Sequence, residues 1–280
     1  MRGFEPRPGL IVMRKIVHLS DLHFGRNDAH IVEHLFSTIC QIQPHFTIIS
    51  GDLTQRATAR QFEEARSFLE RLESSNIPYL VIPGNHDIAP IHRPLSRIFN
   101  PYGNYRAYIS NQTEVYFNDE EVAIASINTV RASLIANGHV AAKQLKKIQE
   151  WFNLFSPSMV RILVTHHHLH GNNTRKYHFS NYRPAWNAKK ATKKLSHSGV
   201  DIYLSGHLHR SSVRRPDALS VHAGTVSKRQ RHEGASFNVL TINIPHMTVE
   251  RYRWQPAIAA FSTEKSDTLL IKGKKKLKDS

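Results

Sequence analysis

Cysteine is almost absent from this chain of 280 residues, in which Cys40 is the single example. One thiol excludes an internal disulfide bond and fits a reducing compartment. Cys40 lies in an apolar pattern of helical spacing, where a small buried hydrophobic residue is more common than a reactive thiol. We therefore expect a cytoplasmic protein, either free in the cytoplasm or peripheral to the inner membrane.

Long apolar runs are also missing. The longest, such as Phe46–Ile49 and Tyr79–Ile82, have the length of a strand and fall far short of a membrane span. Gly9–Met13 is too short for the apolar part of a signal peptide, and no small-residue cleavage site follows it. Because Met13 directly precedes the first strand-like run, we expect residues 1–12 to be a dispensable leader or a misassigned start.

Acidic residues are scarce: 22 Asp and Glu stand against 38 Lys and Arg, which gives a formal net charge of +16. Such a surplus attracts phosphate-bearing ligands, nucleic acids and anionic membranes alike, so charge alone does not choose among them. Residues 171–200 contain no acid, and a separate Lys-rich run occupies 272–278. We expect residues 263–280 to form a basic, disordered tail, with contact to a membrane or a nucleic acid as the alternative.

The apolar spacing alternates between strand and helix over about the first 210 residues. Short β runs follow to residue 254, and no linker or internal repeat divides the chain. The segment 88–108, rich in Pro, Arg and Tyr, predicts a loop or a small cap. With 40% hydrophobic residues the chain can bury one sizeable core, so we expect a single α/β domain over 1–262, a sandwich of mixed sheets. The predicted helices are 29–42, 62–72, 141–155 and 185–198.

Side chains that bind metals come directly after five predicted strands. In open α/β sheets, loops at the carboxyl ends of strands converge on one crevice, so these five segments can assemble a single site. Imidazole and carboxylate ligands together suit zinc, manganese or iron better than calcium. The residues concerned are Asp21 and His23, Asp52, Asn85 and His86, His166, and His207 and His209.

The five segments resemble the signature blocks of the calcineurin-like metallophosphoesterases, in the family's order and over about residues 14–210. The wording of three blocks is similar to that of bacterial class III cyclic-nucleotide phosphodiesterases. The resemblance implies a four-layer α/β/β/α sandwich with mixed sheets. The blocks read Asp21-x-His23, Gly51-Asp52, Gly84-Asn85-His86-Asp87, His166 and Gly206-His207-Leu208-His209.

The same resemblance implies two divalent or trivalent cations (Mn, Fe or Zn) and a hydroxide between them that attacks phosphorus in line. His86, which is not a ligand in the family, would stabilise the transition state and protonate the leaving oxygen. Asp52 would bridge the two cations, and His167 is an alternative to His166. The implied ligands are Asp21, His23, Asp52 and His209 for one metal, and Asp52, Asn85, His166 and His207 for the other.

One departure from the family concerns the residue that orients the catalytic histidine. The protein-phosphatase branch has a second Asp in its Gly-Asp block for this purpose. Here the matching positions are Gln55, Arg56 and Ala57, so the dyad is absent or supplied elsewhere. This departure argues against a Ser/Thr protein phosphatase.

Contacts to the substrate are less well defined by the sequence. Arg26 and Asn27 either contact a substrate phosphate or cap the helix that starts near Asp28. His168 is a candidate for lining the pocket. A basic loop after Gly224-Thr225 is either a simple turn or a rim that contacts phosphate; its basic residues are Lys228, Arg229 and Arg231.

The sequence thus predicts an enzyme, a metal-dependent phosphodiesterase acting on a small nucleotide-type substrate. The alternative is a pyrophosphatase of a nucleotide-linked lipid, like the family's UDP-2,3-diacylglucosamine hydrolases, held at the membrane by its basic surface. The apolar and aromatic residues of 88–108 would then cover an acyl groove or simply pack on the core. A nucleic acid substrate is not expected, because nuclease members usually add a recognition domain. A non-enzymatic scaffold is the remaining alternative, although no expected ligand is missing.

Overall fold

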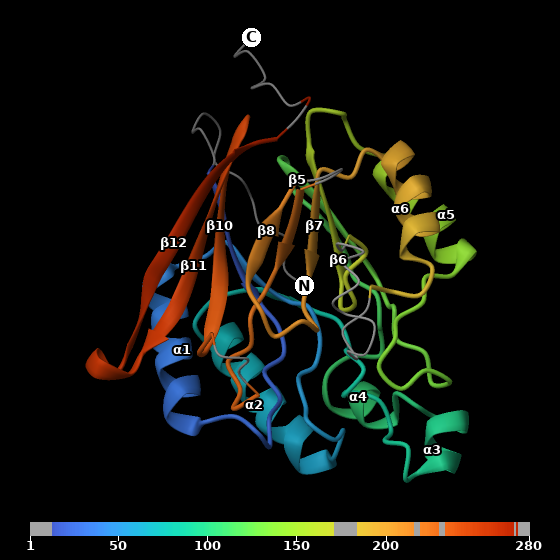
Figure 1. Cartoon of the computed structure of the whole chain (residues 1–280), viewed down its shortest axis with the longest axis vertical. Helices are drawn as coiled ribbons and strands as arrows, with labels where there is room; N and C mark the ends of the chain where they lie inside the picture. Colours follow the sequence, from blue (N-terminus) through green and yellow to red (C-terminus); the bar gives the residue numbers. More distant parts are fainter. Residues whose placement is uncertain (1–12, 171–183, 216–218, 230–232, 272, 274–280) are drawn as a thin grey trace.

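Two six-stranded mixed sheets face each other in the computed structural model, which describes residues 13–170, 184–215, 219–229, 233–271 and 273 (Figure 1). The first sheet has the order β12-β11-β10-β1-β2-β3, with β1, β2 and β3 parallel and β10 to β12 antiparallel. Its strands are β1 (Arg14–Leu19), β2 (Phe46–Ile49), β3 (Tyr79–Val81), β10 (Ser236–Asn243), β11 (His246–Gln255) and β12 (Ala260–Leu270).

The second sheet has the order β4-β5-β6-β7-β9-β8. Its four central strands are parallel, and β4 and β8 pair with them in the antiparallel sense. The strands are β4 (Tyr116–Asn118), β5 (Val122–Ile127), β6 (Val160–Thr165), β7 (Ile202–Ser205), β8 (Ser212–Arg214) and β9 (Leu219–His222). Parallel strands covered on both faces are apolar throughout, which is why β5 and β7 are buried at every position.

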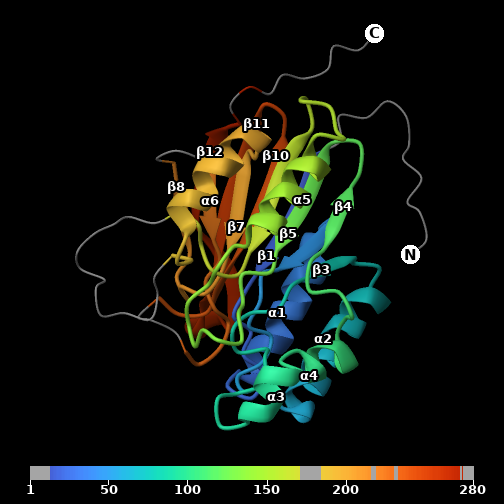
Figure 2. The same cartoon turned by 90° about the vertical axis from the view of Figure 1, so that its right-hand side faces the viewer.

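Helices cover the outer faces of both sheets, so the chain forms the predicted four-layer α/β/β/α sandwich (Figures 1 and 2). One core lies between the sheets. A second lies under α1 and α2, and a third under α5 and α6. The helices are α1 (Ala29–Ile42), α2 (Ala59–Ser74), α3 (Pro94–Phe99), α4 (Gly103–Tyr108), α5 (Ala142–Phe152) and α6 (Ala188–Leu195).

The helices begin where the sequence supplies a cap. The Asp28 side chain accepts a hydrogen bond from the His30 backbone at the start of α1, and the Thr58 hydroxyl accepts one from Gln61 at the start of α2. Asp28 therefore takes the capping role that the sequence left open for this region. Residues at helical spacing, such as Val32, Leu35 and Ile39 in α1, then face the first sheet.

The predicted disordered tail is wrong over residues 263–270. Strand β12 runs to Leu270 and pairs along its length with β11. Its residues are mostly exposed and polar, because it is the edge strand of the sheet, and charged side chains are typical of edges. A polar edge strand resembles a tail in composition. The predictions for residues 1–12, and for the lysines at 272, 274, 275, 276 and 278, lie outside the described residues.

The segment 88–108 folds as the short helices α3 and α4 joined by turns, at the end of the molecule toward which the β7 arrow points (Figure 1). Tyr102, Tyr105 and Tyr108 pack against the core under α2, whereas Leu95 and Phe99 of α3 are exposed. Within the part of the chain that the structure describes, each helix is too short or too polar to span a bilayer.

Candidate metal centre

The five sequence blocks meet at the carboxyl ends of β1, β2, β3, β6 and β7. Backbone hydrogen bonds join them: the Asp21 amide donates to Gly51 at 2.9 Å and the His23 amide to Asp52 at 3.0 Å. Across the two sheets, the His207 amide donates to Asp21 Oδ2 at 2.9 Å. The site therefore lies where the two sheets approach each other, as expected for loops at one edge of parallel strands.

Several of these loops adopt an unusual backbone conformation. Asp21, His23, Asp52, His207 and His209 all have positive φ, between 45° and 66°. Residues other than glycine rarely enter this left-handed region, and those that do cluster at functional sites. The fold thus holds the backbone in a costly conformation at five of the seven predicted metal ligands.

The first cluster consists of Asp21, His23, Asp52 and His209, the same four residues that the resemblance assigns to one metal. Their ligand atoms all lie within 4.8 Å of one another, and all four residues are buried. His209 Nε2 is 3.1 Å from Asp21 Oδ1, and His23 Nε2 is 3.7 Å from Asp52 Oδ2. Neither Asp21 Oδ1 nor Asp52 Oδ2 has a hydrogen-bond partner among the described residues.

Both imidazoles of this cluster are oriented by hydrogen bonds that their Nδ1 atoms donate. His23 Nδ1 donates to the Thr54 carbonyl at 3.2 Å, and His209 Nδ1 donates to the Arg229 carbonyl at 3.1 Å. A carbonyl only accepts, so each ring directs Nε2 into the cluster, and the two Nε2 atoms lie 3.1 Å apart. Two facing lone pairs at this distance repel each other, so either a proton or a metal ion between them stabilises the arrangement. This arrangement is typical of metal-binding histidines, so the residues fit a cation.

The second cluster lies on the other side of Asp52. Asp52 Oδ1 is 3.5 Å from His166 Nε2, and Asn85 Oδ1 is 3.1 Å from the same nitrogen. His166 Nδ1 donates to the Ser50 carbonyl at 2.9 Å, which again directs Nε2 inward. His166, His167 and His207 have ligand atoms within 4.8 Å of one another. The two oxygens of Asp52 therefore face different groups of ligands, as a bridging carboxylate would.

The structure brings both His166 and His167 to this cluster. His167 Nδ1 contacts the Thr129 hydroxyl at 2.8 Å, and its Nε2 is buried without a partner among the described residues. Only His166 approaches Asp52 and Asn85 through a hydrogen-bonded ring. Both histidines belong to the cluster, so the choice of His166 as the ligand stays a prediction.

The electrostatics of both clusters favour positive charge. Burial alone would lower the pKa of His166, but the carboxylate of Asp52 raises it to about 9. Burial would raise the pKa of Asp21, yet His209 and His23 bring it well below its usual range, and His166 does the same for Asp52. The field that holds a proton here also attracts a metal ion, so protons and metals compete for these ligands.

His86 lies beside the first cluster, with its ring 4.9 Å from that of His23. Its Nδ1 donates to the Gln55 backbone carbonyl at 2.8 Å, and its Nε2 accepts from Arg229 Nη1 at 2.9 Å. The dyad that the sequence left unassigned is therefore completed by a backbone oxygen. A backbone acceptor leaves no pattern of side chains in the sequence, so this contact could not be predicted. The sequence indicated Arg229 only through the basic loop after Gly224.

Three residues were expected to contact substrate: Arg26, Asn27 and His168. Asn27 Oδ1 accepts from the Gly25 amide, and Arg26 is exposed with its carbonyl bonded to Lys228. His168 is buried, with its ring 5.6 Å from that of His222, and lies outside both clusters. Substrate contact by these residues stays a prediction.

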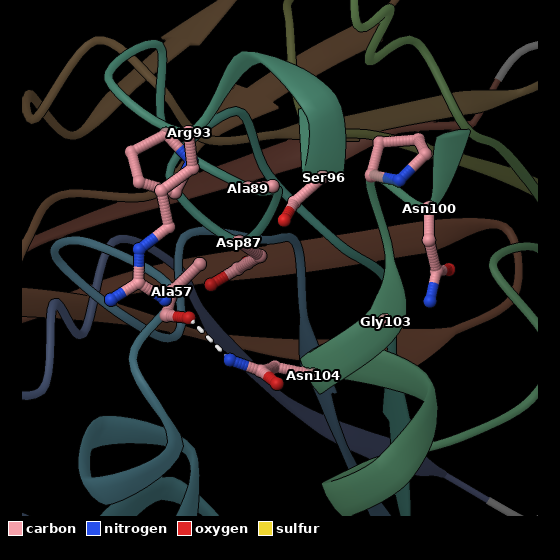
Figure 3. A pocket seen from close by; sticks show the side chains of 10 residues that line it. Ala57, Asp87, Ala89, Arg93, Ser96, Asn100, Gly103 and Asn104 are labelled. Atoms are coloured by element: carbon pink, nitrogen blue, oxygen red, sulfur yellow. Dashed lines mark hydrogen bonds between the residues drawn. The ribbon is translucent and has the colours of Figure 1, made fainter. Parts of the chain in front are cut away.

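A pocket of about 150 Å³ adjoins the site between Asp87 and the α3–α4 segment (Figure 3). Asp87 accepts backbone hydrogen bonds from Leu53, Thr54 and Gly84, while burial and then Asp52 raise its pKa to about 7. Figure 3 shows Arg93, Ser96 and Asn100 around Asp87, and Asn104 bonded to the Ala57 carbonyl. The pocket offers both polar and apolar groups next to the two ligand clusters.

The family described as calcineurin-like phosphoesterase matches residues 14–211 of this chain. The DNA double-strand break repair protein Mre11 of Saccharolobus solfataricus is 37% identical over 87 residues, 27% of this chain and 23% of Mre11. A probable cyclic nucleotide phosphodiesterase of Ruthia magnifica is 27% identical over 165 residues, 56% of this chain and 62% of the relative. The matched segments thus span less than two thirds of each relative.

A solved structure shares the fold at low identity. The dimetal phosphatase from Danio rerio superposes with a TM-score of 0.66 at 11% identity, covering 92% of this chain and 99% of the phosphatase. At that identity the likeness supports the architecture alone.

Proposed function

Because this chain belongs to the calcineurin-like phosphoesterase family, we propose that it is a metal-dependent phosphodiesterase acting on a small nucleotide-type substrate. The observation that carries this proposal is the position of Asp52, with one carboxylate oxygen toward each of two ligand clusters. Two cations held this way suit an in-line displacement at phosphorus.

The residues that would hold the first cation are Asp21, His23, Asp52 and His209, and those for the second are Asp52, Asn85, His166 and His207. When bound, the cations would lower the pKa of water and offset the negative charge of the phosphoryl group. Nitrogen and oxygen ligands in this mixture suit manganese, iron or zinc. We propose that the protein works in the cytoplasm on a small phosphorylated substrate.

The chain's own part in the reaction is to position groups and exclude water. His86 Nδ1 donates to the Gln55 carbonyl, and Nε2 faces the guanidinium of Arg229. Because Nε2 accepts from Arg229 in the structure, it would have to take up a proton from water before it could pass one to the leaving oxygen of a phosphoester. The buried clusters also keep bulk water away from the ligands, which strengthens every charge interaction inside.

A side-by-side assay tests the proposal. The protein is stripped, reconstituted with Mn²⁺, Fe²⁺ or Zn²⁺, and offered bis-p-nitrophenyl phosphate, cyclic AMP and single-stranded DNA. We expect metal-dependent hydrolysis of bis-p-nitrophenyl phosphate and of the nucleotide, but not of DNA. A protein that binds two metals yet hydrolyses none of the three would instead support a scaffold.

A nucleotide-linked lipid is a second candidate substrate, favoured by the orientation of α3. This helix buries its arginine and exposes its apolar residues: Arg97 is 8% exposed, whereas Leu95, Ile98 and Phe99 are 71%, 69% and 80% exposed. The Arg97 guanidinium donates to the carbonyls of Ala89, Ala132 and Leu134, which fixes this orientation. Residues 88–113 contain no acid. An apolar patch beside basic residues suits an anionic lipid surface.

The two candidates separate in one experiment with a UDP-linked acyl sugar presented in anionic vesicles. If the lipid candidate holds, Ile98→Ser with Phe99→Ser lowers this activity and leaves cyclic AMP hydrolysis unchanged. Leu154→Ser is the matched control, since Leu154 is 73% exposed after α5, outside the α3–α4 segment. Activity on cyclic AMP alone would defeat the lipid candidate.

A further inference from the structure

The loop that follows β9 is anchored to the metal-binding loops at several points. The Thr225 hydroxyl donates to the Asp21 carbonyl at 2.6 Å, and Ser227 forms a β-bridge with Asn27. The Lys228 amide donates to the Arg26 carbonyl at 2.9 Å. These contacts hold the backbone of residue 229 at the rim of the first ligand cluster.

Arg229 uses both its backbone and its side chain at this rim. Its carbonyl accepts from His209 Nδ1, so it helps to orient a metal ligand. Its guanidinium is half-buried and donates to His86 Nε2 at 2.9 Å. Among the described residues, no carboxylate forms an ion pair with this guanidinium. A half-buried guanidinium facing a neutral ring has donors and charge available for an anion.

The contact with His86 also defines which group carries charge. A guanidinium only donates, so His86 Nε2 accepts, while His86 Nδ1 donates to the Gln55 carbonyl. The imidazole in this arrangement is therefore neutral, and the permanent positive charge beside it belongs to Arg229. His86 contacts the guanidinium on one side, and its ring is 4.9 Å from that of His23 on the other. A single side chain therefore separates the guanidinium from the first cluster.

We propose that Arg229 is a further catalytic residue, whose guanidinium binds the non-bridging oxygens of the phosphoryl group. This inference rests on the phosphoesterase function proposed above. The planar guanidinium can engage two phosphoryl oxygens at once, and the ammonium of a lysine cannot reproduce that geometry. The gain is largest in the transition state, where negative charge collects on these oxygens.

The test compares Arg229→Met, Arg229→Lys and Arg229→Ala with Lys228→Met in the metal-loaded full chain. Lys228 is a matched control, because its exposed side chain points to Asp28, 3.9 Å away, and forms no contact with His86. We expect Arg229→Met to lower kcat/KM by about 100-fold, the usual effect of losing one such donor. Arg229→Lys should recover only part of this loss, and Lys228→Met should behave like the wild type.

Two further measurements separate a phosphate contact from a structural role. The inhibition constant of inorganic phosphate should rise at least about tenfold in Arg229→Met, while the metal content stays at the wild-type value. Added guanidinium ion should restore part of the activity of Arg229→Ala. Unchanged kcat/KM and phosphate inhibition in Arg229→Met, or loss of metal without rescue by guanidinium, would overturn the proposal.

The experimental results differ if the proposed phosphoesterase function itself is wrong. In that case the metal-loaded wild type hydrolyses no phosphoester at all. Binding of inorganic phosphate to the wild type and to Arg229→Met, followed by calorimetry, still decides whether the guanidinium contacts phosphate. Equal phosphate affinity of the two proteins would refute the role of Arg229 independently of any turnover.

Discussion

Replacement of Asp52 by Asn tests the two-metal assignment directly. One oxygen of Asp52 is 3.7 Å from His23 Nε2, and the other is 3.5 Å from His166 Nε2. Asn keeps the shape and can still accept the hydrogen bond that the His86 amide donates at 2.8 Å. The substitution therefore removes the charge shared by both clusters and little else. We expect the protein to lose both cations.

The size of the effect follows from the number of ligands affected. Disturbing only a residue that supports a ligand costs 10–100-fold in metal affinity in other proteins. Loss of a charged ligand should cost at least about 100-fold for each cation. Hydrolysis should fall by a similar factor when the metal concentration is near the wild-type Kd.

The assay is elemental analysis after dialysis, with Asp21→Asn as the comparison. Asp21 Oδ1 lies 3.1 Å from His209 and 3.7 Å from His23, so it belongs to the first cluster only. Asp21→Asn should keep about one equivalent of metal, and Asp52→Asn close to none. If Asp52→Asn keeps a full equivalent while circular dichroism shows a native fold, the bridging assignment is refuted.

Two other substitutions probe the catalytic and buried histidines. His86→Ala should lower turnover by about 100-fold or more with unchanged metal content, because the backbone amide that bonds Asp52 remains; normal turnover would remove His86 from catalysis. His222 is buried, and burial, followed by Arg214, lowers its pKa from 6.5 to about 3. The unfolded chain therefore takes up a proton first, so unfolding becomes easier as pH falls from 6.5 toward 3. In metal-free protein followed by urea denaturation, His222→Gln should flatten this dependence by about 1.4 kcal/mol per pH unit, and an unchanged slope would contradict the burial argument.

Much of the candidate site could be predicted from the sequence because its residues directly follow hydrophobic strands. Asp21, Asp52 and His166 each come one to three positions after a strand, and parallel strands bring such positions to one edge. The apolar spacing of 62–72 likewise predicted the helix that the structure extends to Ala59–Ser74. These signals are local, so a single chain reveals them.

Other features could not be predicted, because nearby residues do not encode them. The α3 helix carries apolar residues that suggest a packed face, yet three backbone carbonyls hold Arg97 inside and turn Phe99 outward. Strand β12 is polar because it lies at a sheet edge, and only its pairing with β11 distinguishes it from a tail. Whether His166 or His167 binds a metal depends on contacts between distant residues, such as the hydrogen bond from His166 Nδ1 to the Ser50 carbonyl.

By itself the sequence predicted the kinds of metal-binding side chain, their order and their positions at strand ends, since strand and helix periodicity is a property of neighbouring residues. Only the tertiary structure decided which atoms meet. The contact of Arg229 with His86 joins residues 143 positions apart, and His209 reaches His23 across 186 positions. Such contacts depend on how the two sheets pack, which sets side-chain distances that no local pattern contains.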